Sequence, residues 1–149
     1  MFTKKLSNNI FLEDNYETII KHILNKKPKI ISFYTMGNSY FISLIVAEKI
    51  KEINKNIKMI FAGPHASLCS LETLKAFDFI DMVAIGEGEK NIISIIDYFN
   101  NREEIENIKS ICYRKSDRIV YNEAQQIDKC KCYPGTHIYS RYKNNLIFK

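Results

Sequence analysis

Long apolar runs and a leader segment are both missing from this chain. No stretch of its 149 residues approaches the roughly 20 consecutive apolar residues that cross a bilayer. Residues 1–9 have neither the apolar core nor the small-residue cleavage site of a signal peptide. We therefore expect a cytoplasmic protein with no membrane partner. In that compartment the four cysteines are expected to be reduced, at positions Cys69, Cys112, Cys130 and Cys132.

The familiar catalytic and metal-binding motifs are also missing. The cysteines do not form the paired Cys-x-x-Cys pattern of a zinc site. The three histidines (His22, His65 and His137) stand in unrelated contexts, and no Gly-x-Ser-x-Gly elbow of a hydrolase occurs. The sequence therefore predicts no catalytic residue and no metal ligand within this chain.

Signals for nucleotides and nucleic acids are weak. Neither Gly-x-Gly-x-x-Gly nor Gly-x-x-x-x-Gly-Lys-Ser/Thr is present, which argues against a nucleotide-binding enzyme of either common type. The net charge is only +5, and the lysines are scattered, with the densest group at Lys26, Lys27 and Lys29. Without a basic stripe, we expect no nucleic-acid partner.

What the chain does contain is a repeated alternation of apolar elements. Helical spacing and short apolar runs alternate three times with short connections, which is typical of right-handed crossovers in a parallel sheet covered by helices on both faces. The predicted helices are 13–26, 41–54, 71–77 and 89–99, and the predicted strands are 30–34, 57–62 and 82–85.

The pattern changes toward the C-terminus. Residues 111–114 and 118–121 read as a β-hairpin around a polar turn, and residues 123–149 turn polar. We therefore predict a three-layer α/β domain of the Rossmann-like, flavodoxin type, ending in a β-hairpin, over residues 1–122. Residues 123–149 are predicted to be an extended tail or linker.

Glycines collect where ligands bind in such a fold. Ligands of open parallel sheets lie beyond the carboxyl ends of the strands. Three segments end there, at 32–38, 62–67 and 85–89, and they hold most of the glycines. Glycine permits positive φ and close backbone approach, although any one strand-to-helix turn favours glycine for reasons unrelated to a ligand.

The order of these loops resembles a known family. Ser32 lies in the first apolar strand, Ala62-Gly63-Pro64-His65-Ala66-Ser67 ends the second, and Asp81-Met82-Val83-Ala84-Ile85-Gly86-Glu87-Gly88-Glu89 contains the third. With the hairpin that follows, residues 28–121 resemble the second half of the cobalamin-binding domain of cobalamin-dependent radical SAM proteins. Their Gly-Pro-His-Ala-Ser and Gly-Glu-Gly-Glu loops are the specific part of the likeness.

The resemblance implies a set of cofactor-binding residues. Ser32, Tyr34 and Thr35 would lie where the nucleotide tail of cobalamin threads the domain. The next loop would line that channel, and the third would face the catalytic domain; their residues are Gly63, Pro64 and His65, and then Gly86, Glu87, Gly88 and Glu89. Ala62 replaces the first glycine of the family's usual pair, and its methyl group would narrow the channel.

The role of one residue in this set stays open. His65 either contacts the ligand or bonds to its own backbone, and it is not expected to ligate cobalt.

The chain departs from the family in two places. The family's first strand, helix and second strand, with their Asp-x-His-x-x-Gly loop, have no counterpart here. Without that first strand, residues 30–34 would form an exposed sheet edge, which is an aggregation liability. We therefore expect the edge to be covered by residues 1–11, by the tail, or by a second copy of the chain in a homodimer.

The second departure concerns the catalytic part of the family's proteins, whose cluster-binding motif this chain does not contain. The Cys-x-x-x-Cys-x-x-Cys motif that holds a [4Fe–4S] cluster is absent, since Cys130-x-Cys132 has the wrong spacing. The cluster and S-adenosyl-L-methionine are thus expected only in a radical SAM domain outside this chain. Whether this chain takes part in an enzyme reaction stays open.

Two functions follow from these observations. The first is a cobalamin-binding module of a radical SAM protein, which would position a corrinoid and its cobalt for a catalytic domain elsewhere. The alternative is a non-catalytic protein-interaction domain that kept the fold and lost the cofactor. The retained loops favour the first, and the absent upstream elements favour the second.

Overall fold

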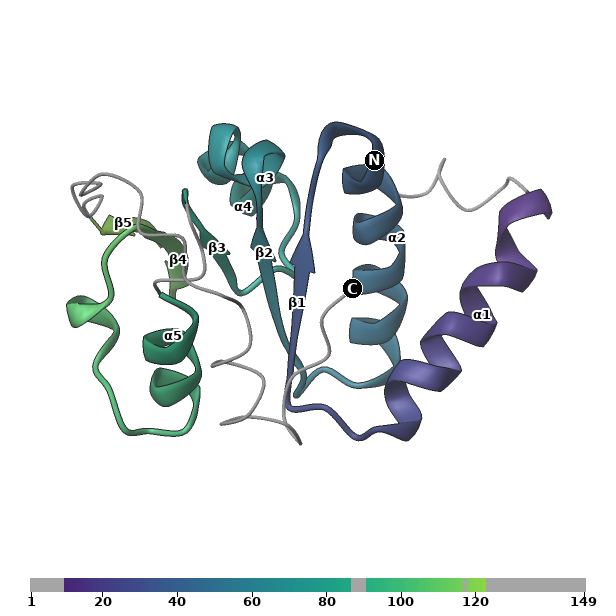
Figure 1. Cartoon of the computed structure of the whole chain (residues 1–149), viewed down its shortest axis with the longest axis horizontal. Helices are drawn as coiled ribbons and strands as arrows, with labels where there is room; N and C mark the ends of the chain where they lie inside the picture. Colours follow the sequence, from purple (N-terminus) through teal and green to yellow (C-terminus); the bar gives the residue numbers. More distant parts are fainter. Residues whose placement is uncertain (1–9, 87–90, 117, 123–149) are drawn as a thin grey trace, which may run out of the picture.

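A five-stranded sheet organises the protein. The computed structural model describes residues 10–86, 91–116 and 118–122, with side chains from Tyr16 onward. The strands follow one another in chain order, β1-β2-β3-β4-β5. β1–β2 and β2–β3 are parallel, whereas β3–β4 and β4–β5 are antiparallel. Figure 1 shows the two parallel strands β1 and β2 at the centre, with their carboxyl ends upward.

The strands and helices lie close to where the sequence predicted them. The strands are β1 (Ile30–Tyr34), β2 (Lys58–Ala62), β3 (Met82–Ala84), β4 (Ile111–Lys115) and β5 (Arg118–Asn122). The helices are α1 (Ile10–Asn25), α2 (Gly37–Ile53), α3 (Pro64–Leu68), α4 (Ser70–Ala76) and α5 (Ile92–Phe99), with a 3₁₀ turn η3 (Ile105–Asn107). No helix among the described residues has both the length and the apolar character needed to cross a membrane.

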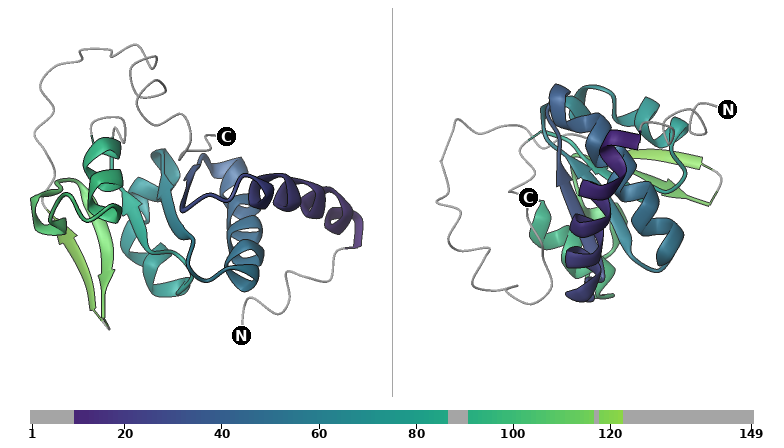
Figure 2. Two further views of the ribbon diagram at one scale, coloured as in Figure 1. Left: turned by 90° about the horizontal axis from the view of Figure 1, so that it is seen from below. Right: turned by 90° about the vertical axis from the view of Figure 1, so that its right-hand side faces the viewer.

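Two apolar cores, one on each face of the sheet, make the three layers. Alternate side chains of a strand point to opposite faces, so neighbours such as Ile30 and Ile31 enter different cores. One face packs against α1, α2, α3 and α4, and the other against α5 and η3. Figure 2 shows α1 and α2 beside the sheet from two further directions. The predicted three-layer fold with its hairpin is thus confirmed.

One helix was not predicted. α3 begins directly at Pro64, where the sequence indicated only a turn. Proline at the first helical position is favourable, because its missing N–H would be unpaired there in any case. The helix is five residues long, too short for a periodic apolar pattern to reveal it.

β1 is the outer strand of the described sheet. Its neighbours Lys29 and Thr35 direct backbone groups toward β2, since Lys58 N–H donates to Lys29 O over 2.9 Å and Thr35 N–H donates to Ala62 O over 2.7 Å. By the alternation of a parallel ladder, Ile30, Ser32 and Tyr34 direct theirs away from β2. Of the covers predicted for this edge, residues 1–9 and residues 123–149 lie outside the described residues, and a second copy of the chain stays a prediction.

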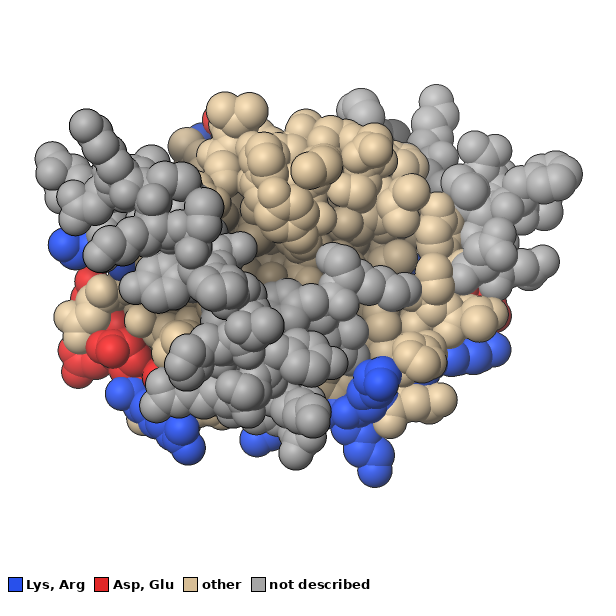
Figure 3. Space-filling view, viewed as in Figure 1, with Lys and Arg blue, Asp and Glu red and all other residues tan. Residues whose placement is uncertain are grey.

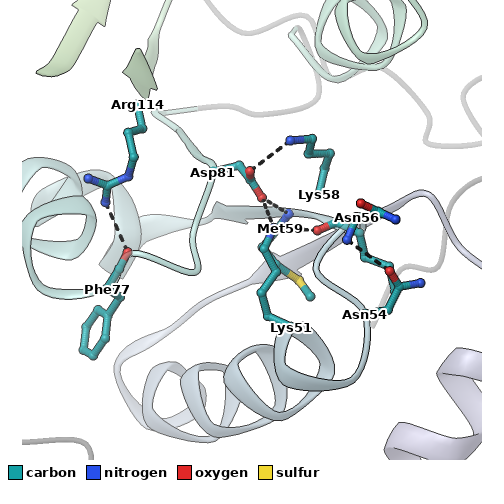
Figure 4. Close-up of polar contacts among 9 residues, drawn as sticks. Lys51, Asn54, Asn56, Lys58, Met59, Phe77, Asp81 and Arg114 are labelled. Carbon is teal, nitrogen blue, oxygen red and sulfur yellow. Dashed lines mark hydrogen bonds and ion pairs between the residues drawn. The ribbon is translucent and has the colours of Figure 1, made fainter. Parts of the chain in front are cut away.

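The amino ends of the strands are joined by an ionic cluster around Asp81 (Figure 4). Lys51 of α2 donates to Asp81 Oδ2 over 2.7 Å, and Lys58 lies 3.3 Å from Asp81 Oδ1. Met59 N–H donates to the same carboxylate over 2.8 Å. Asp81 belongs to the motif that the family resemblance singled out, yet it lies at the end of the sheet opposite the three loops.

Candidate functional site at the carboxyl ends of the strands

Thr35 joins the first two loops. It follows β1 directly and is 0% exposed. Its hydroxyl donates to Ala62 O over 2.9 Å and accepts the Ala66 N–H over 3.3 Å. Its carbonyl accepts the His65 N–H over 3.3 Å. Together with the bond from the Thr35 N–H to Ala62 O, these contacts fix the end of β1 against the end of β2 and the start of α3.

Gly63 makes that contact possible. Its φ is +97°, and a Cβ added there would lie 2.6 Å from Thr35 O and 2.8 Å from Thr35 N. No side chain fits against backbone atoms at such distances. The glycine that the resemblance placed beside the cofactor is therefore required already by the packing of the protein on itself.

Ser67 joins the second loop to the third. Its hydroxyl donates to Gly63 O over 2.8 Å and accepts the Gly86 N–H over 3.0 Å. Gly86 has φ +73° and begins the segment that leads into α5. The hydroxyls of Thr35 and Ser67 thus connect all three loops, at least as far as Gly86.

An aromatic contact lies beside the three joined loops, which are called the rim from here on. The rings of Tyr40 and His65 are 4.2 Å apart, and Tyr40 Oη lies 2.6 Å from Thr73 Oγ1. Burial raises the pKa of the Tyr40 phenol, so it stays protonated at neutral pH. Tyr40 consequently supports the His65 ring from α2, and nothing in this arrangement requires His65 to bond to its own backbone through its ring.

The predicted residues are placed as follows. Tyr34 and Pro64 are exposed, Ser32 and His65 are partly buried, and Thr35 and Gly63 are buried. Ser32 and Tyr34 share the face of the sheet that carries α5. Glu87, Gly88 and Glu89 lie outside the described residues. The remaining predicted residues lie together at the carboxyl ends of the strands, except that Ser32 lies in the middle of β1.

Two contributors to the site were missed by sequence reasoning. Ser67 was quoted in the motif but given no role, and Ala66 supplies the N–H that Thr35 accepts. A hydroxyl four residues after a glycine that begins a short helix is the available signal, because such a side chain reaches back to the first carbonyl of the helix.

A hollow lies at the opposite end of the sheet from these loops. A cleft of about 450 Å³ opens at the amino ends of β1 and β2. Its lining includes the basic residues Lys27, Lys29 and Lys58 and the apolar residues Ile57 and Phe99. Lysines also belong there because the C-terminal ends of α1, α2 and α5 meet at this end of the sheet. It is not the predicted site.

Replacing Thr35 tests the first link directly. Thr35→Val keeps the volume of the side chain but leaves the Ala66 N–H without its acceptor. We expect a loss of about 2 kcal/mol in the free energy of unfolding, measured by urea denaturation, because a buried donor would be unpaired. Thr35→Ser keeps the hydroxyl and should recover most of this loss. Equal stability of the valine and serine variants would contradict the role of the hydroxyl.

A family model and a curated relative match this chain in sequence. Residues 7–96 match the model of the B12 binding domain family. The chain is 24% identical over 115 residues to the uncharacterized methyltransferase PH0819 of Pyrococcus horikoshii, covering 77% of this chain and 25% of that protein.

The solved structures agree on the fold. The cobalamin-dependent S-adenosylmethionine radical enzyme OxsB, with aqua-cobalamin and S-adenosylmethionine bound, matches with a TM-score of 0.64 and 16% identity, over 75% of this chain and 16% of the OxsB chain. OxsB without ligands matches with a TM-score of 0.55. The chain thus spans a quarter or less of the length of these relatives. On the strength of the family match, which includes the three strands and the loops that follow them, this chain belongs to the B12-binding domain family.

Proposed function

We propose that this chain is a corrinoid-binding module, which holds cobalamin over the carboxyl ends of β1, β2 and β3 and presents it to a radical SAM domain carried by the rest of a longer protein. The observation that carries the proposal is the linkage of the three family loops through Thr35 and Ser67. A flat, rigid ligand needs a rim whose parts keep their positions relative to each other, and two hydroxyls supply that here.

Each residue of the rim has a role under this proposal. Ser32, which is partly buried, and Tyr34, which is 57% exposed, lie on the α5 face and would contact the nucleotide tail of the cofactor. Pro64 and His65 would line the passage, and Gly86 would lead into the third contact segment, residues 87–89. Thr35 and Gly63 are buried, so they would position the rim without contacting the ligand themselves.

The residues present fit a corrinoid. Cobalamin brings its own cobalt, so the chain needs no set of metal ligands, and none of three or more His, Cys, Asp or Glu occurs among the described residues. When bound, the corrinoid would supply methyl-transfer or radical chemistry. The [4Fe–4S] cluster and S-adenosyl-L-methionine would belong to the radical SAM domain. Residues 1–122 would form the module, and residues 123–149 the linker toward that domain.

The second candidate is a protein-interaction domain without a cofactor. The open edge of β1 favours it, because the backbone groups of Ile30, Ser32 and Tyr34 face away from β2. Such an edge pairs readily with a further strand, from the longer protein or from a second copy. If the added strand came from the longer protein, the edge and the corrinoid site would operate together. If it came from a second copy, the chain would form a homodimer.

Titration with hydroxocobalamin separates the two candidates. The purified chain is mixed with the cofactor and desalted, and its visible spectrum is recorded. We expect close to one equivalent to be retained, whereas the interaction-domain reading predicts none. Ser32→Ile adds volume at a strand position and should lower retention about tenfold, while Ser32→Ala removes the hydroxyl without adding volume and should lower it much less. Retention that is unaffected by Ser32→Ile would place the ligand elsewhere.

A further inference from the structure

The lysine-lined cleft at the amino ends of β1 and β2 has no role in the proposed function. Its volume of about 450 Å³ lies within the range of about 300–1,000 Å³ that is typical of small-molecule sites. Three parts of the chain form it, namely the connection from α1 to β1, the connection from α2 to β2, and the end of α5. Figure 3 shows Lys and Arg side chains along the lower margin of the described surface, at this end of the sheet.

The charged residues in the described lining of the cleft are all lysines, Lys27, Lys29 and Lys58. Among the described residues, no carboxylate lies within 4.0 Å of the ammonium group of Lys27 or Lys29. Lys58 shares the single carboxylate of Asp81 with Lys51, so that cluster keeps one positive charge. The C-terminal ends of α1, α2 and α5 each bring about half a negative charge, which leaves the cleft positive.

The backbone of Lys27 is unusual for a lysine. Its φ is +49°, in the left-handed region, where glycine or asparagine commonly ends a helix. Its N–H donates to Leu24 O over 2.9 Å, so this conformation closes the last turn of α1. Lys26 already provides a cation for the negative end of that helix. Lysine at position 27 is thus disfavoured by the backbone and not needed by the helix, which indicates that its ammonium group serves the cleft.

The polar groups of the cleft suit a phosphate on a flat polar body. Lysine binds phosphate as a compact point charge, whereas planar carboxylates are better matched by arginine, which the described lining does not contain. Asn54, Asn56 and Asn100 add side-chain amides. The amide of Asn56 has no partner among the described residues, so it can pair with the edge of a heterocycle, and Phe99 offers that heterocycle an aromatic surface.

A second hollow, of about 180 Å³, indicates where the phosphate would lie. It shares Lys58 and Phe99 with the cleft, but its lining also includes the carboxylates of Asp78 and Asp81. Like charges repel, so a phosphate is disfavoured on that side. The end of the cleft that carries Lys27 and Lys29 is the favourable one.

We propose that the lysine-lined cleft binds a nucleoside monophosphate, with the phosphate beside Lys27 and Lys29 and the base against Phe99. The site does not need a glycine-rich phosphate loop, because lysine side chains would hold the phosphate in place of a helix N-terminus. The inference goes beyond the proposed function and does not depend on it, since the cleft and the rim lie at opposite ends of the sheet.

Three probes separate the two halves of the ligand. Isothermal titration calorimetry of the purified chain, without corrinoid, is carried out with AMP, adenosine and inorganic phosphate. A pH of about 8 makes the phosphates dianionic, and about 0.05 M salt limits screening. We expect AMP to bind at least about tenfold more tightly than adenosine or phosphate, because the ammonium groups and the apolar lining then contribute together.

Two neighbouring lysines provide a matched pair of variants. Lys27→Asn removes an ammonium group from the cleft and supplies a residue that the left-handed backbone favours, so the urea midpoint should not fall. AMP should bind about tenfold more weakly to this variant, as the loss of one charge-assisted hydrogen bond implies, with adenosine unchanged. Lys26→Asn removes the same charge one position earlier, outside the lining of the cleft, and should weaken AMP binding less than about twofold.

The outcomes decide the inference by themselves. Tighter binding of AMP than of adenosine or phosphate, weakened by Lys27→Asn and not by Lys26→Asn, supports it. No binding of AMP, binding of adenosine as tight as that of AMP, or unchanged binding in Lys27→Asn would overturn it. Equal weakening by both variants would also overturn it, because the effect would then come from overall charge and not from the cleft.

Discussion

Gly63→Ala should destabilise the protein by about 3 kcal/mol or more, a large share of the stability of a domain of this size. Two costs add. A φ of +97° with ψ 175° lies in a region that is nearly restricted to glycine, which costs about 1–3 kcal/mol for another residue. The added Cβ would also lie 2.6 Å from Thr35 O, so backbone must shift in either β1 or the loop before α3.

Gly86→Ala is the matched control. Gly86 also has a positive φ, +73°, but a Cβ there would meet no atom within 4 Å among the described residues beyond its chain neighbours. Only the conformational cost remains, about 1 kcal/mol. Urea denaturation of the three proteins, with equal slopes in the transition region, gives both values. If the two alanine variants lose the same stability, the close approach of Gly63 to Thr35 contributes nothing and our account of that glycine is wrong.

Asp81→Ala is expected to have the second largest effect, a loss of about 2 kcal/mol. Asp81 accepts from Lys51 Nζ and from Met59 N–H, and Lys58 lies 3.3 Å away. Removal of one partner of a fully buried pair costs about 3–5 kcal/mol, and the value is reduced here because the side chains of Lys51 and Asp81 retain 17% and 24% exposure. The loss comes chiefly from leaving the Met59 N–H without an acceptor and the Lys51 ammonium without its counter-charge, although Lys51 Nζ still donates to Ile57 O over 2.7 Å.

Two variants separate charge from hydrogen bonding at Asp81. Asp81→Asn keeps an acceptor for Met59 N–H and should lose less than Asp81→Ala. Glu106→Gln breaks a comparably short pair, Lys115 Nζ to Glu106 Oε1 at 2.7 Å, but both side chains are largely exposed, so no shift of the denaturation midpoint is expected. An effect of Glu106→Gln as large as that of Asp81→Ala would show that burial is not what makes the Asp81 cluster matter.

The predictable part of the structure is the part with a repeated pattern. The run Ile30 to Tyr34 is apolar at both alternating positions because each face of β1 is covered by a different core, and this pattern predicted the strand with its exact bounds. The crossover order followed from the alternation of strands and helices. The hairpin followed from two short runs around a polar turn, and the structure adds that it extends the sheet beside β3.

The unpredicted part depends on single contacts between distant residues. Ser67 acts on Gly86, which lies 19 positions away, and Thr35 acts on Ala66, which lies 31 positions away. No local pattern encodes such pairs. The family resemblance found the loops but not how they are joined, and it assigned Asp81 to the same motif as Gly86 although the two residues serve opposite ends of the sheet.

The glycine at position 63 can be explained in two ways, by a bound cofactor or by the packing of the protein itself. As part of the resemblance it indicated close approach of the backbone to a cofactor. In the structure its missing side chain is needed by Thr35, whether or not a cofactor is present. Loss of corrinoid binding in a Gly63 variant would therefore report on the fold first, which is why Ser32 is the better position for testing the ligand.

Amide hydrogen exchange with and without hydroxocobalamin tests the central claim most directly. If a corrinoid lies over the carboxyl ends of the strands, peptides covering residues 32–40, 62–68 and 84–86 should exchange more slowly when it is present. Peptides covering the amino end of the sheet, residues 52–58, should be unchanged. Slower exchange confined to 52–58 would place the ligand in the lysine-lined cleft, and no change anywhere would mean that this chain does not bind the corrinoid at all.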